Sequence, residues 1–302
     1  MKRLPQIGLL PDGKRMHLQD GPIDLIIEAK GKEADVRATY QAAARRFTGL
    51  LDELCEELVE LRRAASPAHC ALKGVVARRM HEAVVPFAAD HFITPMAAVA
   101  GSVAEEILGA MLGVARLDRA YVNNGGDIAL HLTGGEQFTV GLMDRPDRHG
   151  LMRTMVVDAG DPTRGVATSG RHGRSFSLGI ADAVTVLART ASQADAAATI
   201  IANAVDLPGH PAIARCPANE LAPDSDLGAR LVTRGVGQLT ENEVADGLEA
   251  GARCARRWLT AGLIEGAALR LLGETVVVGA AAIETRQSRA FHGNAIESMM
   301  HA

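Results

Sequence analysis

Asn123-Asn124-Gly125-Gly126-Asp127 joins two segments that predict β-strands, Arg119–Val122 and Ile128–Leu132. Because Asn and Gly tolerate a positive φ, the stretch is typical of a connecting turn. Its last residue, Asp127, adds a second interpretation, because a ligand can approach a carboxylate closely beside a Gly-Gly backbone. The stretch therefore predicts a turn between two strands and makes that turn a candidate ligand-binding site.

A second run of small residues, Val166-Ala167-Thr168-Ser169-Gly170, also lies between predicted strands. One interpretation is a nest in which backbone N–H groups and hydroxyls hold an anion or a sugar, and the other is a solvent-facing turn. Arg171, His172 and Arg174 follow directly and would supply positive charge for phosphates. This stretch is the second candidate for contact with a ligand.

Asp195 and Thr199 form the third candidate. They are four residues apart in a predicted helix that begins at Ser192 and runs through Ala204, so they lie on one helix face. A carboxylate and a hydroxyl placed in this way can donate two oxygens to one Mg²⁺. The alternative is that an acidic residue in a first helical turn simply complements the helix dipole.

Hydrophobic and turn patterns elsewhere predict helices and strands in blocks rather than in strict alternation, which is typical of an α+β fold. We treat residues 1–302 as a single domain because no linker or repeat divides them. A carboxylate such as Asp182 in an otherwise apolar predicted strand needs a structural reason. The predicted elements are a hairpin in 15–30, helices in 33–63, 72–88, 97–113 and 241–261, strands at 138–143, 153–157, 175–187 and 274–280, and a loop-rich region at 207–235.

Composition limits the class of protein. The net charge of -4 and the aromatic content of 3% give no support for nucleic-acid binding. Four cysteines without CxxC or CxxH spacing favour reduced thiols, and the first residues lack the apolar core of a secretion signal, so we expect a cytoplasmic protein. We also expect no membrane span. The Ala-rich helices are consistent with a homodimer and equally with packing in a core.

Most histidines are expected to pack in the core or to lie on the surface. His69, His81, His91 and His131 have no mutual metal-ligand spacing. His210, which precedes a proline in the loop-rich region, is the one that we expect to approach a site. The sequence therefore points to oxygen ligands rather than to a histidine-based metal centre.

In order along the chain, four segments resemble motifs of the ApbE-like flavin transferases, which are FAD:protein FMN transferases. The resemblance covers residues 90–205 and implies an ApbE-like domain with an antiparallel or mixed sheet and packed helices. The matching segments are the small-residue run Ala97–Ser102, the turn Gly125-Gly126-Asp127, the stretch Ala167-Thr168-Ser169-Gly170, and the pair Ala194-Asp195 with Thr199.

The resemblance also implies a function. In that family FAD binds with Mg²⁺, and FMN is transferred to a Thr or Ser hydroxyl of an acceptor protein. Carried over, Asp195 and Thr199 would ligate the metal, with Asp195 as the catalytic position, helped by a backbone carbonyl in the segment Ala98–Ala100. The Gly-Gly-Asp turn and the Ala-Thr-Ser-Gly stretch would line the flavin nucleotide.

The chain departs from the family pattern at two places. The family has a His-Ile-Ile-Asp-Pro-x-Thr-Gly segment after Ala-Thr-Ser-Gly, whereas here the stretch is Phe176–Asp182, without His, Pro or Thr. The family's lysine before the small-residue helix is also missing, because Ala100 runs directly into Gly101. Two alternatives therefore stay open: an enzyme acting on another small heterocycle such as a pterin, and a non-catalytic flavin-binding module.

Overall fold

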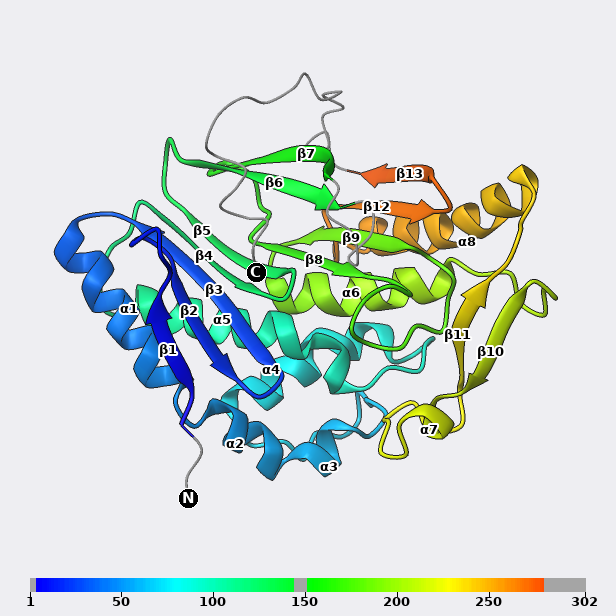
Figure 1. Ribbon diagram of the computed structural model, residues 1–302, viewed down its shortest axis with the longest axis horizontal. Coiled ribbons are helices and arrows are strands. Elements are labelled where there is room, and N and C mark those ends of the chain that lie inside the picture. Colours follow the sequence, from blue (N-terminus) through cyan, green and yellow to red (C-terminus); the bar gives the residue numbers. More distant parts are fainter. Residues whose placement is uncertain (1–3, 144–150, 280–302) are drawn as a thin grey trace.

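The computed structural model describes residues 4–143 and 151–279, and within them nine strands form one sheet (Figure 1). Every neighbouring pair in this sheet is antiparallel, in the order β1-β2-β3-β4-β5-β8-β9-β12-β13. The strands are β1 (Gln6–Leu9), β2 (Met16–Asp20), β3 (Ile23–Lys30), β4 (Arg119–Asn124), β5 (Asp127–Leu132), β8 (Gly165–Ser169), β9 (Ala183–Ala188), β12 (Gly266–Leu271) and β13 (Glu274–Gly279).

Helices cover one face of the sheet and a separate hairpin covers the other. Two large apolar clusters lie between the sheet and the helices, and a third lies between the sheet and the β6–β7 hairpin. The α+β prediction is therefore confirmed.

The remaining elements are α1 (Glu33–Phe47), α2 (Leu50–Glu56), α3 (Leu58–Leu61), α4 (Val75–Val84), α5 (Val99–Leu112), α6 (Ala191–Ala204), α8 (Glu241–Thr260), the 3₁₀ turns Val85–Phe87 and Pro95–Ala98, and β6 (Gln137–Met143) with β7 (Leu151–Asp158).

Two strand assignments differ from the sequence prediction. The Val166–Gly170 run is largely a strand, β8, which pairs with both β5 and β9. The predicted strand 175–187 is a strand only from Ala183 onward, and the residues before it form a loop across the end of α6. At Gly179 a Cβ atom would lie 2.8 Å from the carbonyl oxygen of Val205, so close packing on α6 replaces the strand pairing there.

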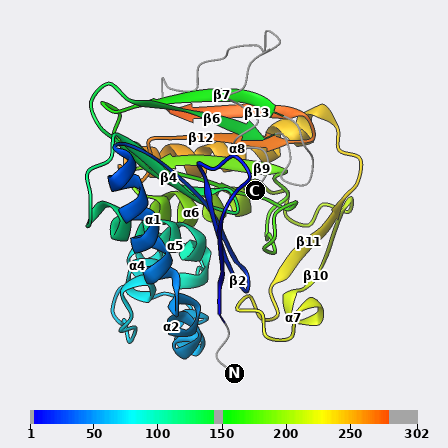
Figure 2. The ribbon, with the colours of Figure 1, turned by 60° about the vertical axis from the view of Figure 1, so that its left-hand side comes forward.

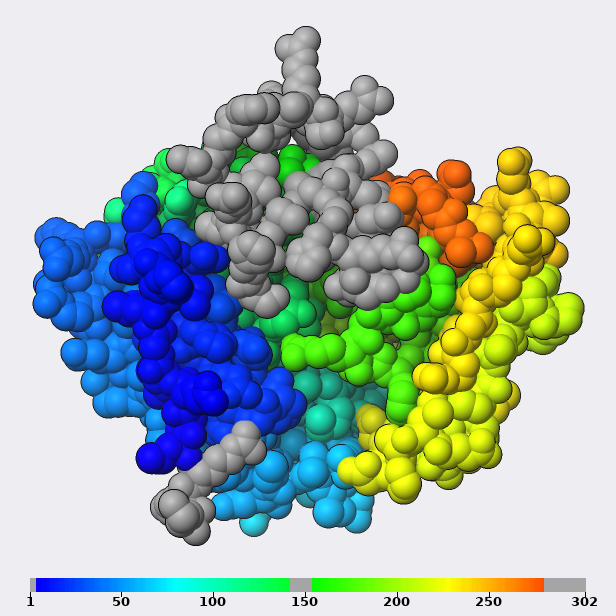
Figure 3. All heavy atoms as spheres, in the orientation of Figure 1, coloured from blue at the N-terminus to red at the C-terminus, as the bar shows by residue number. Residues whose placement is uncertain are grey.

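The region predicted to be loop-rich contains an ordered arm instead. Its elements are β10 (Ile213–Pro217), α7 (Ala218–Leu221) and β11 (Leu231–Val236), with β10 and β11 paired antiparallel. Figures 1 and 2 show the arm standing beside the main sheet. In the space-filling view the arm (yellow) and the N-terminal strands (blue) stand apart, with green and teal residues between them (Figure 3).

Polar contacts fasten the arm to the rest of the molecule. The Thr94 hydroxyl donates to Asp226, and Arg62 pairs with Asp224 at 2.9 Å. Both carboxylates belong to the acidic stretch between α7 and β11. The sequence predicted loops here because turn residues are frequent in this region, and because its two strands are short and pair only with each other.

The Ala-rich helices α5 and α6 lie in the interior. Their alanines and glycines allow α5, α6 and the sheet to approach closely, so packing in the core accounts for the composition. Contrary to the sequence expectation, one described stretch, Pro95–Leu112, is long and apolar enough to cross a membrane by length and hydropathy alone. Half of that stretch is buried inside the protein, as in a core helix.

Candidate active site

The Gly-Gly-Asp stretch is the turn of the β4–β5 hairpin. Gly125 and Gly126 have φ values of 63° and 112°, as a two-residue hairpin with positive φ at both positions requires. The N–H of Gly126 donates to the Asn123 side-chain oxygen at 2.8 Å, and Asn124 pairs with Asp127 across the hairpin. The turn thus fixes Asp127 as the first residue of β5 at the edge of the site.

Close approach between backbones places Asp195 beside the start of α5. A Cβ atom on Gly101 would lie 2.5 Å from the carbonyl carbon of Ala191 and 2.8 Å from the nitrogen of Ser192, so only glycine fits there. On the other side of α6, a Cβ atom on Gly165 of β8 would overlap the carbonyl of Thr190. The first turn of α6 is therefore held between α5 and β8.

Asp195 serves as a cap for α5 from another helix. The residue before α5 is Ala98, which has no side-chain acceptor for the free N–H groups of the first turn. Instead the N–H of Gly101 donates to Asp195 Oδ2 at 3.0 Å. A carboxylate has about four acceptor positions, so this bond leaves oxygen lone pairs available to a cation.

Asp127 and Asp195 are electrostatic neighbours. Burial raises the pKa of Asp127 to about 7, although the N–H of Thr168 and the charge of Arg174 both favour its ionised form. Burial, and next the charge of Asp127, raise the pKa of Asp195 well above its usual range, against the opposing effect of the Gly101 and Ala100 N–H groups. Two carboxylates that share a partly buried site cannot both ionise cheaply without a cation between them.

The Ala-Thr-Ser-Gly stretch meets this pair through its backbone rather than as a nest. The N–H of Thr168 donates to Asp127 Oδ1 at 3.2 Å, while its hydroxyl bonds to the Thr185 hydroxyl at 2.8 Å. Ala167 is fully buried and packs in the core, and Gly170 is buried at the end of β8. Ser169 is partly buried and completes the stretch.

The charged residues after β8 divide into two groups. Asp182 accepts from Arg171 at 2.5 Å, from the His172 ring at 3.1 Å and from the Leu272 N–H at 2.6 Å, which explains a carboxylate among apolar neighbours. Arg174 instead reaches the Gly-Gly-Asp turn, because a Cβ atom on Gly125 would lie 2.9 Å from the Arg174 guanidinium carbon. Of the three predicted cations, Arg174 is the one beside Asp127.

The structure brings some predicted residues together and separates others. Thr199 follows Asp195 by one turn of α6 and is partly buried. Ala98 is completely buried at the start of α5, whereas the carbonyl of Ala100 accepts from the Asn124 amide at 3.1 Å. His210 lies away from the pair and contacts Glu243 at the start of α8 at 2.9 Å.

The contacts of Asn124 and Gly101 were not predicted, although both residues lay within segments that the sequence analysis singled out. Asn124 ties the β4–β5 turn to α5, and Gly101 supplies the N–H that holds Asp195. Gly101 lay within the small-residue run for which close packing was predicted, so that run carried the signal. No sequence signal indicated the contact of Asn124 with α5, because asparagine is common in turns for other reasons.

The donor set fits a hard cation. Within residues 4–143 and 151–279, no cluster of three or more His, Cys, Asp or Glu side chains has metal-binding geometry. The oxygen donors here are two carboxylates, and Thr199 lies one helical turn beyond Asp195 in α6. Mg²⁺ suits such a set, because it keeps several waters and uses one or two carboxylates together with substrate phosphates. The observation that supports the fit is that two partly buried carboxylates lie together, each accepting a backbone N–H and keeping further oxygen lone pairs for a cation.

The fold and site define an α+β protein with a carboxylate-lined site built on a Gly-Gly-Asp hairpin. The chain belongs to the family described as AbpE bacteria, whose model matches residues 7–277. It is 41% identical over 129 residues to a UPF0280 protein of Methanopyrus kandleri, covering 42% of this chain and 48% of that relative. A UPF0280 protein of Methanothermobacter thermautotrophicus is 41% identical over 117 residues, covering 38% and 44%.

The matched region spans about half the length of these curated relatives. Among solved structures, the chain is similar to the ApbE protein of Thermotoga maritima, with a TM-score of 0.44 and 14% identity over 78% of this chain and 98% of that one. It is also similar to the flavinyl transferase ApbE of Pseudomonas stutzeri in its apo form. That comparison gives a TM-score of 0.41 and 12% identity over 93% and 96% of the two chains.

Proposed function

We propose that this protein is a Mg²⁺-dependent enzyme that cleaves the pyrophosphate of FAD, and that it transfers FMN to a hydroxyl of an acceptor protein. The observation that carries the proposal is the geometry of two neighbouring, partly buried carboxylates, Asp127 and Asp195, each held by a backbone N–H group from another element. Such a pair costs free energy in the empty protein, and a bound cation removes that cost. Membership of the AbpE family supports FAD as the nucleotide.

The residues of the site take different roles in this proposal. Asp195, Thr199 and Asp127 would hold the cation, which when bound neutralises charge on the pyrophosphate oxygens. The Arg174 guanidinium, beside the Gly-Gly-Asp turn, binds a phosphate oxygen. Gly125 and Gly126 carry no side chains, so the turn leaves the nucleotide room against the backbone. Thr168 orients Asp127 through its N–H.

In the reaction, the bond between the flavin-side phosphorus of FAD and the bridging oxygen breaks, and that oxygen leaves with AMP. The FMN phosphate joins the acceptor oxygen, AMP leaves, and the acceptor hydroxyl loses its proton to solvent. When water replaces the acceptor, the products are free FMN and AMP. In place of the family's His-containing segment, the chain has the loop Phe176–Asp182, whose last residue pairs with Arg171 and His172.

The direct test is to incubate the purified protein with FAD and Mg²⁺, with and without a peptide that carries Ser or Thr, and to separate the products by chromatography. We expect AMP release that requires Mg²⁺ and stops on chelation. FMN bound to the peptide indicates transfer, and free FMN indicates hydrolysis. Absence of AMP in both reactions contradicts the proposal, and a protein that retains FAD without turnover is a binding module.

Arg174→Gln tests the phosphate contact separately. We expect the affinity for Mg²⁺-pyrophosphate to fall about tenfold, because one charge-assisted bond to phosphate is lost. Isothermal titration calorimetry measures the change. The matched control is Arg116→Gln, which alters an exposed arginine in a loop outside the site. Equal affinities for the wild type and for Arg174→Gln would mean that Arg174 does not contact the phosphate.

A further inference from the structure

A second carboxylate holds α5 and α6 together, in the opposite direction from Asp195. Glu105, on α5, accepts from the Ser192 N–H at 2.6 Å through its Oε1. Ser192 is the second residue of α6, so its N–H belongs to the first turn, where a helix supplies no acceptor of its own. Asp195 likewise belongs to α6 and accepts from an N–H of α5, at Gly101. Each helix therefore caps the other where their backbones meet.

The Ser192 N–H depends on Glu105 for its hydrogen bond. The residue before α6, Thr190, uses its hydroxyl to accept from the Gln193 N–H at 3.2 Å. Because Ser192 is buried, water has little access to its N–H. Removal of the Glu105 carboxylate would leave a buried donor without an acceptor, which destabilises this position of the first turn.

Arg79 of α4 orients the Glu105 carboxylate. Its Nε lies 3.4 Å from Glu105 Oε2, and its Nη1 donates to Glu106 at 2.9 Å and to the Ser102 carbonyl at 3.1 Å. These attachments fix the guanidinium against α5, so the other oxygen of Glu105 faces α6. The positive end of the α6 dipole also favours a carboxylate there. A line of contacts thus runs from α4 through α5 to the first turn of α6.

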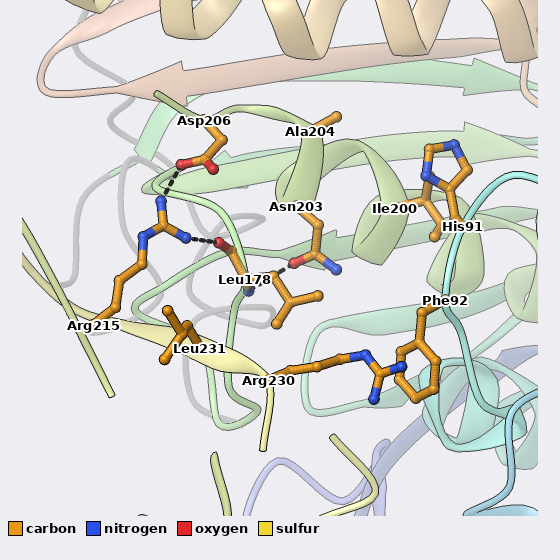
Figure 4. A pocket seen from close by; sticks show the side chains of 10 residues that line it. All are labelled: His91, Phe92, Leu178, Ile200, Asn203, Ala204, Asp206, Arg215, Arg230 and Leu231. Carbon is orange, nitrogen blue, oxygen red and sulfur yellow. Dashed lines mark hydrogen bonds and ion pairs between the residues drawn. The ribbon is translucent and has the colours of Figure 1, made fainter. Parts of the chain in front are cut away.

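The far end of α6 is attached separately. The side-chain oxygen of Asn203 accepts from the Leu178 N–H at 2.9 Å, beside the pocket that Figure 4 shows. Asn203 lies eight residues beyond Asp195, which is about 12 Å along a helix. The two ends of α6 therefore have different anchors, and only the anchor at Glu105 acts on the turn that carries Asp195.

We propose that Glu105 is a positioning residue for the cation site. Its carboxylate is engaged by Ser192 and Arg79, so its role toward the cation is indirect. By holding the Ser192 N–H it fixes the first turn of α6, and that turn places Asp195 beside Asp127. Mg²⁺ requires near-ideal octahedral geometry, so a small shift of one ligand weakens its binding. The inference rests on the proposed function, because that function makes Asp195 a cation ligand.

Binding of Mn²⁺ alone tests the inference on the full chain. Mn²⁺ takes the same oxygen ligands as Mg²⁺, and electron paramagnetic resonance measures the concentration of the free ion. We expect Glu105→Ala to weaken Mn²⁺ binding about tenfold or more in a protein that circular dichroism shows to be folded. Glu105→Gln keeps an oxygen that accepts from the Ser192 N–H, so it should retain nearly the wild-type affinity.

Asn203→Ala is the matched control in the same helix. It also removes a side-chain acceptor from a backbone N–H, but at the end of α6 that lies away from Asp195. A loss of stability alone does not change the affinity of molecules that remain folded. We therefore expect Asn203→Ala to lower the Tm and to bind Mn²⁺ as wild type does.

Hydrogen exchange of the Gly101 N–H reports on the same turn without any metal. That N–H is bonded to Asp195, so a shift of the first turn of α6 exposes it to exchange. We expect exchange about tenfold or more faster in Glu105→Ala than in wild type, and little change in Asn203→Ala. NMR of protein labelled with ¹⁵N-glycine measures both rates.

The outcomes separate the inference from the proposed function. If wild type and Glu105→Ala bind Mn²⁺ equally well, the cation site stands and the positioning role is wrong. The role is also wrong if Glu105→Gln loses as much affinity as Glu105→Ala, because charge then explains the effect, or if Asn203→Ala loses as much. A wild type that binds no Mn²⁺ contradicts the proposed function. The Gly101 exchange then decides alone: faster exchange in Glu105→Ala supports the positioning of Asp195, and unchanged exchange rejects it.

Discussion

Asp195→Asn is expected to abolish Mg²⁺-dependent release of AMP from FAD, with a loss of at least about 100-fold, while the protein stays folded. Asparagine retains a side-chain oxygen that accepts from the Gly101 N–H, so the cap on α5 survives. The substitution removes only the negative charge and one oxygen donor of the cation site. Chromatographic measurement of AMP at saturating FAD and Mg²⁺ gives the rate of each protein.

The same variant has a distinct signature in stability. Burial and the charge of Asp127 raise the folded-state pKa of Asp195 above its unfolded value, which is about 3.9. Between these two pKa values the folded protein binds more protons than the unfolded chain, so the free energy of unfolding falls as pH rises. Asparagine does not titrate. We therefore expect metal-free Asp195→Asn to melt at or above the wild-type temperature at pH 8, with the difference shrinking toward pH 4.

Mg²⁺ should reverse the order of the two melting temperatures, because it stabilises only a protein that binds it. Differential scanning calorimetry with Mg²⁺ and with a chelator separates the two conditions. Asp246→Asn is the matched control, since Asp246 is an exposed acidic residue of α8. A variant that unfolds more easily than wild type in chelator at pH 8 would mean that Asp195 is a structural cap and that no cation site exists there.

Gly101→Ala is expected to lower the free energy of unfolding by about 3 kcal/mol or more and the Tm by about 6 °C or more. The added Cβ atom meets the backbone of Ala191 and Ser192, which cannot rotate away as a side chain would. Moving α6 away also pulls Asp195 from the N–H that holds it, so activity should fall together with stability. Chemical denaturation monitored by circular dichroism measures the first effect.

The control lies in the same helix. Gly109 is exposed in α5, and a Cβ atom there meets nothing within 4 Å. Gly109→Ala should therefore be neutral or stabilising by up to about 1 kcal/mol, because alanine has the higher helix propensity. If both substitutions destabilise equally, general helix effects explain the result, and the close crossing of α5 and α6 at Gly101 is not a constraint.

The elements with strong local signals were predictable. The 15–30 hairpin, the long helix 241–261 and the turn at Gly125-Gly126 were all confirmed, because hydrophobic periodicity and positive φ are properties of neighbouring residues. The loop before β9 was not predictable, since Ser175–Leu178 alternates like a strand and only its packing on α6 prevents pairing. The β10–β11 arm was not predicted for a similar reason, because the turn residues in its sequence outweighed the weak signal of two short strands.

The sequence by itself determined the α+β class, the turn that carries Asp127 and the helix that carries Asp195 and Thr199. Only the tertiary structure decided that the two carboxylates are neighbours, that a backbone N–H of α5 holds one of them, and that Arg174 rather than Arg171 faces the site. The physical reason is that burial and electrostatic interaction depend on segments that are distant in the chain. Those segments meet because Gly101 and Gly165 let α5, α6 and β8 approach within backbone contact.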